Sequence, residues 1–221
     1  MKRIPESCEL MDDLVEARAY ADSDFSEPHD AFVALFKHLF PKFSAGLVLD
    51  IGCGNADPTI RFAKVYPNAH IIGLDGSETM LSFGREAVKK AGLSDRIKLE
   101  RKMLQEYTPL PELFDTIICN SVLHHLEPPE SLWIAITRLA KKDAPVLVMD
   151  FFRPATVEVA EELVAMHAKD SPELMTGGFY NSLLAAYRPN EVRMQINDAG
   201  FPAFRIEVVS DRHMIIFGEI K

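Results

Sequence analysis

Short, almost continuously apolar runs recur along the middle of the chain, and each is followed by a stretch in which apolar residues return every three or four positions. Continuous apolar runs indicate buried strands, and the longer spacing indicates amphipathic helices. Their alternation predicts a mostly parallel sheet with helices on both faces. The predicted strands occupy residues 47–51, 70–75, 97–103, a run within 114–126, and 144–152. The helices between them occupy residues 59–66, 77–92 and 129–141, with Ser77 as an N-cap.

Two parts of the chain interrupt this alternation with helical patterns alone. Helical spacing at 11–20 and 29–39 precedes the first strand, and the segments 157–169 and 179–186 follow the fifth. We expect the N-terminal part to pack across the ligand-bearing edge of the sheet as a lid, and the later pair to form an insertion over the strand ends.

The C-terminal part predicts a hairpin that closes the sheet. A helix at 189–199 stops at Gly200, and strands at 202–210 and 212–220 meet in a short turn. A chain of 221 residues with 48% hydrophobic residues can build one compact domain. We expect a single domain whose parts are a helical cap (1–45), a ligand-binding core (46–150), a helical insertion (151–188) and the final helix and hairpin (189–221).

Charge and cysteine content restrict the partners of this protein. A formal net charge of -9 repels phosphate backbones and anionic membrane surfaces, so neither nucleic acid nor a membrane is expected as a partner. Cys8, Cys53 and Cys119 have no close pairing, and two of them lie in apolar runs, so neither a disulfide nor a metal site is expected. No secretion signal or long apolar segment is visible, which predicts a cytoplasmic protein, either monomer or homodimer.

The segment LDIGCGNA at 49–56 is the strongest local signal for a ligand site, because it ends a strand, turns and opens a helix. Gly52 and Gly54 lack a Cβ and let a ligand approach the main chain closely. Asp75 follows Gly54 by 21 residues and ends the second strand, where a carboxylate can accept hydrogen bonds from two ribose hydroxyls. Taken alone, the two glycines could form an ordinary tight turn, and Asp75 could be a helix cap. The glycine turn and Asp75 together indicate a nucleotide-like ligand.

In order and spacing, LDIGCGNA, GLDGSETML and FDTIICNSVLHHL resemble the cofactor-binding motifs of class I (Rossmann-like) S-adenosylmethionine (SAM)-dependent methyltransferases. The resemblance covers residues 46–150, and residues 190–220 are similar to the last helix and hairpin of the small-molecule members. It implies an α/β fold with a doubly wound seven-stranded sheet of order 3-2-1-4-5-7-6, its last pair antiparallel.

The resemblance also implies roles for individual residues in binding SAM. Asp50 would lie near the methionine amino group, Asp75 would hold the ribose, and Asn120 would lie close to the methionine moiety and the transferable methyl. Near the adenine, many relatives have an acidic residue where this chain has Lys102-Met103-Leu104. Met103 or Leu104 would cover the ring by apolar contact instead. The remaining cofactor-binding candidates are Gly52, Cys53, Gly54, Gly76 and Ser77, and the turn carries Asn55-Ala56 where many relatives have a further glycine.

A dinucleotide is the rival cofactor, because Rossmann folds share the first strand–helix–strand unit. Its fingerprint needs a small residue where this chain has Asp57, and a carboxylate there would repel a pyrophosphate. SAM carries a positive sulfonium and no phosphate, so an acidic site favours SAM, with S-adenosylhomocysteine (SAH) as the product.

Four residues are candidates for catalysis or acceptor binding. Methyl transfer is an in-line displacement in which holding the nucleophile near the methyl supplies much of the rate, so a base is optional. His124 and Asp150 follow strands four and five and can take a proton from an acceptor; the plainer interpretation is that His124 lines a turn and His125 packs against the backbone. Arg153 can bind an acceptor carboxylate or pair with Asp150, and Tyr20 belongs to a segment that can close over SAM.

The sequence predicts an enzyme that transfers the methyl group of SAM to a small-molecule acceptor. One alternative is a SAM- or SAH-binding regulatory or partner protein without methyl transfer, because no obligatory base is visible. Another is a methyltransferase acting on RNA or protein, for which a basic groove or an NPPY-like step would be expected where this chain has NSVLHHL.

Overall fold

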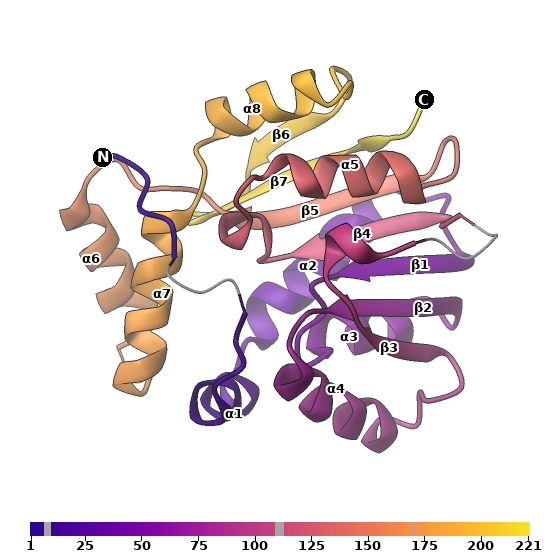
Figure 1. The fold of residues 1–221 in the computed structure, drawn as a ribbon, viewed down its shortest axis with the longest axis horizontal. Coiled ribbons are helices and arrows are strands. Elements are labelled where there is room, and N and C mark those ends of the chain that lie inside the picture. The colour runs from indigo at the N-terminus through magenta and orange to yellow at the C-terminus, as the bar shows by residue number, and fades with distance from the viewer. Residues whose placement is uncertain (7–9, 109–112, 170) are drawn as a thin grey trace.

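A seven-stranded sheet of order β3-β2-β1-β4-β5-β7-β6 forms the centre of the molecule (Figure 1), as the sequence predicted. The computed structural model describes residues 1–6, 10–108, 113–169 and 171–221. Strands β1 to β5 run parallel, and β7 is antiparallel to both β5 and β6. The strands are β1 (Ala45–Ile51), β2 (Asn68–Asp75), β3 (Ile97–Arg101), β4 (Thr116–Asn120), β5 (Pro145–Phe151), β6 (Arg205–Val208) and β7 (His213–Glu219).

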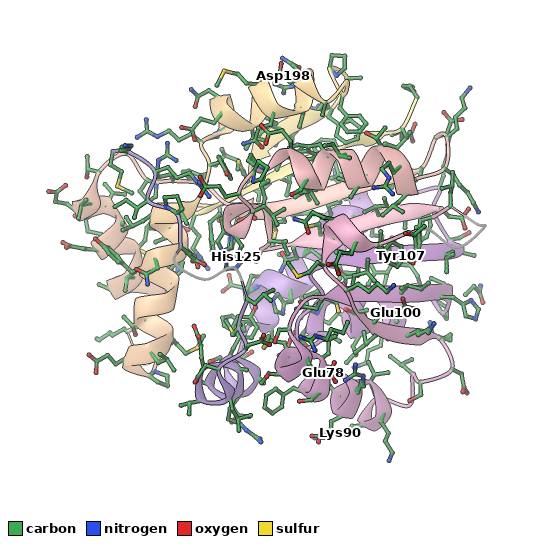
Figure 2. The ribbon with its side chains drawn as sticks, viewed as in Figure 1. Glu78, Lys90, Glu100, Tyr107, His125 and Asp198 are labelled. Carbon is green, nitrogen blue, oxygen red and sulfur yellow. The ribbon has the colours of Figure 1, made fainter. Side chains whose placement is uncertain are left out.

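Helices cover both faces of the sheet, because successive side chains of its buried strands point to opposite sides. Leu49 and Ile51 pack under α5 and α8, whereas Val48 packs with α2, α3 and α4 on the other face. These helices are α2 (Ser26–Leu39), α3 (Asp57–Val65), α4 (Glu78–Lys90), α5 (Glu130–Leu139) and α8 (Pro189–Asp198). Their outer surfaces carry charged side chains, such as Glu78, Lys90 and Asp198 (Figure 2).

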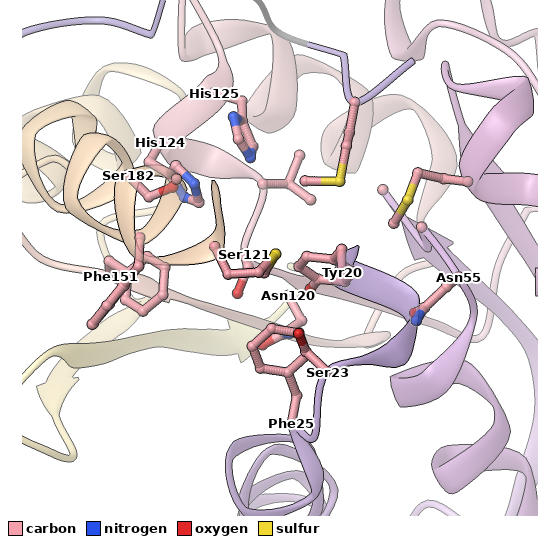
Figure 3. A pocket seen from close by; sticks show the side chains of 18 of the residues that line it. Tyr20, Ser23, Phe25, Asn55, Asn120, Ser121, His124, His125, Phe151 and Ser182 are labelled. Atoms are coloured by element: carbon pink, nitrogen blue, oxygen red, sulfur yellow. The ribbon is translucent and has the colours of Figure 1, made fainter. Parts of the chain in front are cut away.

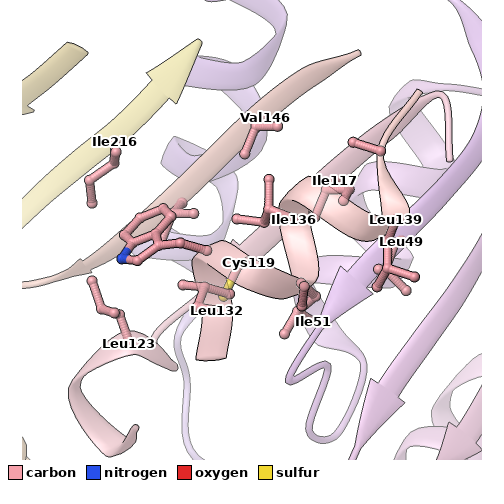
Figure 4. Packing of buried hydrophobic residues seen from close by; sticks show 14 of the residues in the cluster. Leu49, Ile51, Ile117, Cys119, Leu123, Leu132, Ile136, Leu139, Val146 and Ile216 are labelled. Atoms are coloured by element: carbon pink, nitrogen blue, oxygen red, sulfur yellow. The ribbon is translucent and has the colours of Figure 1, made fainter. Parts of the chain in front are cut away.

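The face under α5 and α8 holds the largest buried side chain, Trp133, whose Nε1 donates to Oε1 of Gln195 at 3.1 Å and so joins the two helices. Aliphatic side chains of β1, β4, β5 and β7, among them Leu49, Ile117, Val146 and Ile216, fill the space beneath them (Figure 4). Cys119 lies in this packing as a small apolar residue, and burial raises the pKa of its thiol well above the usual value. Cys53 is also buried, and Cys8 lies outside the described residues.

Helix α2 corrects the expectation that the whole N-terminal region forms a lid. Phe36 of α2 packs against Phe62 of α3 with ring centroids 4.9 Å apart, and both rings are fully buried. Most of α2 is therefore core on one face of the sheet. Only the first turn, with His29, reaches the ligand edge.

Three helices gather beside the carboxyl ends of the parallel strands: α1 (Leu14–Asp22), α6 (Val157–His167) and α7 (Glu173–Ala185) (Figure 1). Helices α6 and α7 share a small apolar cluster that includes Leu163 and Leu183. Helix α7 begins six residues earlier than the predicted 179–186. Two single 3-10 turns, η1 (Leu104–Glu106) and η2 (Leu123–His125), complete the described elements.

The first six residues run along α7 and tie it to the sheet. The backbone amide of Ile4 donates to the carbonyl of Leu184 at 3.1 Å. Arg3 donates through Nε to the carbonyl of Ala185 at 2.6 Å and through Nη2 to the carbonyl of His124 at 3.0 Å. Within the described part of the chain, no helix has both the length and the apolar character needed to cross a membrane.

Candidate active site

A cavity of about 1310 Å³ lies along the carboxyl ends of β1, β2, β4 and β5, where open α/β sheets bind their ligands. Residues 4–6, α1, the first turn of α2, α6 and α7 complete its walls. Pockets for single small molecules have volumes of roughly 300–1,000 Å³. The cavity is therefore large enough for a nucleoside cofactor together with a second molecule.

The turn after β1 requires glycine. Gly52 and Gly54 have φ values of 68° and 51°, in the left-handed region that favours glycine. A Cβ on Gly52 would lie 2.2 Å from Cγ2 of Val122, so no larger residue fits there. Ala56, where many relatives carry a further glycine, adopts φ 63° directly before α3 and is fully buried. The turn thus keeps the same kind of backbone with alanine as its third small residue, at a conformational cost of about 1–2 kcal/mol.

Asp75 joins two turns at the edge of the cavity. Its Oδ2 accepts a hydrogen bond from the amide of Gly54 at 2.8 Å, and its Oδ1 accepts one from the amide of Ser77 at 2.8 Å. Burial raises the pKa of this carboxyl above its usual value, although the two amide hydrogen bonds act in the opposite direction. Each carboxylate oxygen can accept a further hydrogen bond, so the group suits a pair of neighbouring hydroxyls on a ligand.

Two of the expected cofactor residues, Asp50 and Ser77, lie behind the cavity wall. Asp50 is 2% exposed, and Thr59 donates to its Oδ2 through Oγ1 at 2.5 Å. Burial raises the pKa of Asp50 to about 7. Ser77 is the N-cap of α4, as predicted, because its Oγ accepts from the amide of Met80 at 3.1 Å. These two residues support the site from outside the cavity.

Apolar side chains line the cavity next to Asp75. A Cβ on Gly76 would come within 2.7 Å of Sδ of Met103 and 2.6 Å of Cδ2 of Leu10, so both side chains pack directly over this glycine. Leu104 also lines the cavity here. The sequence singled out Met103 and Leu104 but not Leu10, which comes from the segment before α1 and carries no recognisable motif.

Asn120 ends β4 at the floor of the cavity (Figure 3). Its side chain is 9% exposed, and Oδ1 has no hydrogen-bond partner among the residues that the structure describes. A buried carbonyl oxygen without a partner is unfavourable, and a donor group on a bound ligand would satisfy it. This unsatisfied acceptor is therefore a candidate contact for a donor group of a bound ligand.

His124 and Asp150 form a buried pair at the ends of β4 and β5. Nδ1 of His124 lies 2.6 Å from Oδ1 of Asp150, and the backbone amide of His124 donates to Oδ2 at 3.1 Å. The side chains are 2% and 1% exposed. Since the carboxylate holds Nδ1, Nε2 is the ring atom left to act as an acceptor. Asp150 itself does not line the cavity but fixes the orientation of His124, which does.

His125 corrects the plainer sequence interpretation, in which it packs against the backbone while His124 lines the turn. His124 is the buried residue of the two, and Nδ1 of His125 lies 2.5 Å from Oε2 of Glu6. The rings of His124 and His125 lie side by side, with centroids 4.0 Å apart (Figure 3). Glu6 was not predicted from the sequence, because nothing near it suggests chemistry.

Arg153 does not reach the cavity, so the structure corrects its expected contact with an acceptor. Its Nη1 donates to the carbonyl of Ala186 at 2.8 Å, and its Nη2 pairs with Oε1 of Glu191 at 2.5 Å. It is 5% exposed and does not pair with Asp150. Arg153 instead ties the end of β5 to the start of α8.

Tyr20 lines the cavity from α1, beside Phe25, with ring centroids 4.7 Å apart. Burial raises the pKa of its hydroxyl to about 12, and the carboxylates of Asp57 and Asp75 add to this effect. The hydroxyl is therefore protonated at neutral pH and acts as a hydrogen-bond donor or acceptor. Phe151 and Phe179 supply further rings to the wall; they lie in the predicted fifth strand and in the predicted insertion.

Known proteins resemble this chain in both sequence and structure. A family model described as a methyltransferase domain matches residues 42–200. The demethylmenaquinone methyltransferase of Bacillus cytotoxicus is 32% identical over 110 residues, which are 49% of this chain and 46% of that protein. The chain spans less than two thirds of the length of the curated relatives it matches.

Two solved structures share the fold. A SAM-dependent methyltransferase from Aquifex aeolicus superposes with a TM-score of 0.69 at 19% identity, covering 95% of this chain and 99% of that one. The magnesium protoporphyrin IX methyltransferase from Synechocystis PCC 6803, solved with bound SAH, gives 0.64 at 18% identity and covers 92% of each chain. Because the family model spans most of the sequence and the strand order agrees with the expected one, this chain belongs to the methyltransferase domain family.

Proposed function

We propose that this protein binds SAM in the cavity and transfers its methyl group to a small-molecule acceptor. The observation that carries the proposal is Asp75, a carboxylate held by the amides of Gly54 and Ser77 with its remaining acceptor capacity at the cavity edge. A ribose diol supplies two neighbouring hydroxyls that match this group. The family assignment and the SAH bound in the Synechocystis structure support the same ligand.

The other residues of this part of the cavity fit SAM as well. Met103 and Leu10, which pack on Gly76 and line the cavity, present apolar side chains that could cover one face of a flat ring. The unsatisfied Oδ1 of Asn120 can accept a hydrogen bond from the amino group of a methionine moiety. When bound, SAM supplies an electrophilic methyl on a positively charged sulfur. Asp50 lies behind the wall, and because its pKa is about 7 its carboxyl is only partly ionised at neutral pH, so it offers a bound cation at most a partial negative charge.

His124 is the residue that we propose as the proton acceptor for a hydroxyl or amine substrate. Asp150 orients the ring and would stabilise its protonated form, so Nε2 can take the proton while the substrate attacks the methyl. Tyr20 keeps its proton and positions the bound molecules by hydrogen bonding. Arg153 has no place in the reaction, because its guanidinium is paired elsewhere.

The aromatic wall supports a ring-containing acceptor. Phe151 stacks on His213 with centroids 4.9 Å apart and lies 5.4 Å from Phe179. These rings line the cavity on the side of His124. The named substrates of the relatives, demethylmenaquinone and magnesium protoporphyrin IX, are ring systems too. The net charge of -9 argues against a nucleic-acid substrate.

The first test is calorimetric titration with SAH, with NAD as the control ligand. We expect micromolar binding of SAH, no binding of NAD, and SAH affinity at least about 100-fold weaker in Asp75→Asn, since a charged acceptor of hydrogen bonds is lost. Asp115→Asn is the matched control: Asp115 also accepts a backbone amide, from Leu47, but does not line the cavity. Failure of the wild type to bind SAH would overturn the proposal.

A screen for methylated products by mass spectrometry then tests the transfer itself. We expect SAM turnover with a small aromatic hydroxyl or amine compound. Tight SAH binding without turnover of any acceptor would favour the alternative that the protein binds SAM as a regulatory or partner protein.

A further inference from the structure

A second cluster of polar side chains lies in the cavity where residues 4–6, α7 and the turn after β4 meet. Glu6, His124 and His125 each offer one ligand atom to it, and these atoms lie within 4.8 Å of one another. Among the described residues this is the only group of three or more His, Cys, Asp or Glu side chains arranged in this way. Neither proposed SAM contacts nor the core packing explains why three such groups meet here.

Outer partners hold two of these side chains in orientations that suit a metal ion. Asp150 occupies Nδ1 of His124, which leaves the lone pair of Nε2 available as a ligand. Histidines that bind metals usually donate their other ring nitrogen to a carboxylate or carbonyl in this manner. Ser182 donates to Oε1 of Glu6 at 2.8 Å and leaves Oε2 toward His125.

The ligand atoms would have to shift to bind an ion: the 2.5 Å contact between Glu6 and His125 would widen, and separations of up to 4.8 Å would shorten. Zinc bonds of about 2.0–2.2 Å to nitrogen and oxygen place neighbouring tetrahedral ligands roughly 3.3 Å apart. His124 is 2% exposed and held by Asp150, whereas Glu6 and His125 are 15% and 27% exposed. The 2.5 Å contact of Glu6 with His125 already places a carboxylate against an imidazole, and a dication could be held between the two groups.

We propose that Glu6, His124 and His125 bind one divalent transition-metal ion, with Zn²⁺ as the representative case, and leave at least one coordination position open to the cavity. Two imidazoles and one carboxylate are a ligand set typical of zinc and of non-haem iron. Three protein ligands with an open position are characteristic of catalytic rather than structural zinc. The cysteine-based expectation of no metal did not consider this set, because Glu6 lies far from both histidines in the sequence.

The ion would have a role in the reaction that rests on the proposed methyl transfer. An acceptor hydroxyl at the open position would have its pKa lowered by the dication and would release its proton to solvent before attacking the methyl. In the metal-bound form, Nε2 of His124 is a ligand and no longer accepts that proton. Metal binding itself does not depend on this role.

The experiment uses full-length protein without a histidine tag, treated with a chelator and titrated with Zn²⁺ by calorimetry and with Co²⁺ by visible absorption. We expect one ion per chain with micromolar or tighter affinity. Glu6→Gln and His125→Ala should each weaken binding by at least about 100-fold, as expected when one of three ligands is removed. Thermal melting confirms that each variant is folded.

His167→Asn is the matched control, because it removes an imidazole that also contacts a carboxylate, that of Asp211 at 2.7 Å, and also lines the cavity. We expect it to bind the ion like the wild type. Binding absent at about 100 μM metal, which corresponds to a free energy weaker than roughly -5.5 kcal/mol, would overturn the proposal. Unchanged affinity in folded Glu6→Gln would overturn it as well.

SAH titrations on the same samples separate this proposal from the proposed function. SAH binding without metal binding would refute only the metal site. Metal binding without SAH binding would refute only the methyl transfer.

Discussion

The cavity has two halves that are built in different ways. The half around Asp75 comes from consecutive strand ends, and the contact between Gly54 and Asp75 spans only 21 residues. The half around His124 brings the N-terminal segment together with α7, because the hydrogen bond from Ser182 to Glu6 spans 176 residues. The fold alone places the groups of the first half, whereas those of the second depend on how the N-terminal segment and the insertion pack on it.

The half around Asp75 rests on the sheet core, whereas the half around His124 also depends on α6 and α7, so core substitutions in these two regions should have different effects. The largest expected effect is at Trp133, in the sheet core. Removing this fully buried side chain as Trp133→Ala should reduce the global free energy of unfolding by about 3–5 kcal/mol. Leu183→Ala, in the small cluster of α6 and α7, should instead open these helices locally. Urea denaturation measures the first effect and hydrogen exchange the second. Equal loss of global stability in both variants would break the comparison.

The pH dependence of stability tests the half around Asp75, because the buried carboxyl of Asp50 lies behind it. Asp50 has a pKa of about 7 in the folded protein and about 3.9 when unfolded. The folded state therefore keeps a proton that the unfolded state releases, and this residue makes stability fall as pH rises from about 4 to about 7. The slope is at most about 1.4 kcal/mol per pH unit.

Asp50→Asn should remove this slope, so the variant should gain stability relative to the wild type as pH rises toward 7. Burial lowers the pKa of His213 to about 4, and that residue acts in the opposite direction, since its unfolded form binds the extra proton. Its contribution is common to both proteins and cancels in their difference. Urea midpoints at several pH values between 5 and 8 measure the effect. A difference that does not change with pH would contradict the assignment.

The smallest effect concerns Arg153, which joins the sheet to α8 outside the cavity. Arg153→Met should cost about 1–3 kcal/mol of unfolding free energy, because the carbonyl of Ala186 and the partly exposed carboxylate of Glu191 lose a partner. SAH affinity should stay within a few-fold of wild type. Urea denaturation measures the loss of stability, and calorimetry measures the SAH affinity. A large loss of SAH affinity would contradict the placement of Arg153 outside the site.

Sequence patterns were enough to predict the fold and to bring Gly52, Gly54 and Asp75 to one edge of the sheet. Buried parallel strands produce continuous apolar runs, and Gly52, Gly54 and Asp75 follow directly from where two of these strands end. The order of all seven strands was confirmed. The bounds of α7 were wrong at the start, because Gly177 and Gly178 read as a break although the helix runs through them.

His124 and Asp150 were named from the sequence, but the other partners in the half around His124 could not be predicted, because their contacts are set by tertiary packing. Arg153 comes two residues after β5, but its side chain pairs with Glu191. No local sequence pattern predicts this partner. Glu6 meets His125 only because Ile4 and Arg3 dock along α7. Short polar segments give no periodic signal that could place them.

The double hydrogen bond at Asp75 means that loop order and ligand affinity depend on the same side chain. Because these hydrogen bonds hold both turns in shape, ligand binding should lose little conformational entropy on this side of the cavity. A shortened side chain at this position would then cost affinity twice: once through the lost contact, and again because each later ligand would have to order both turns itself.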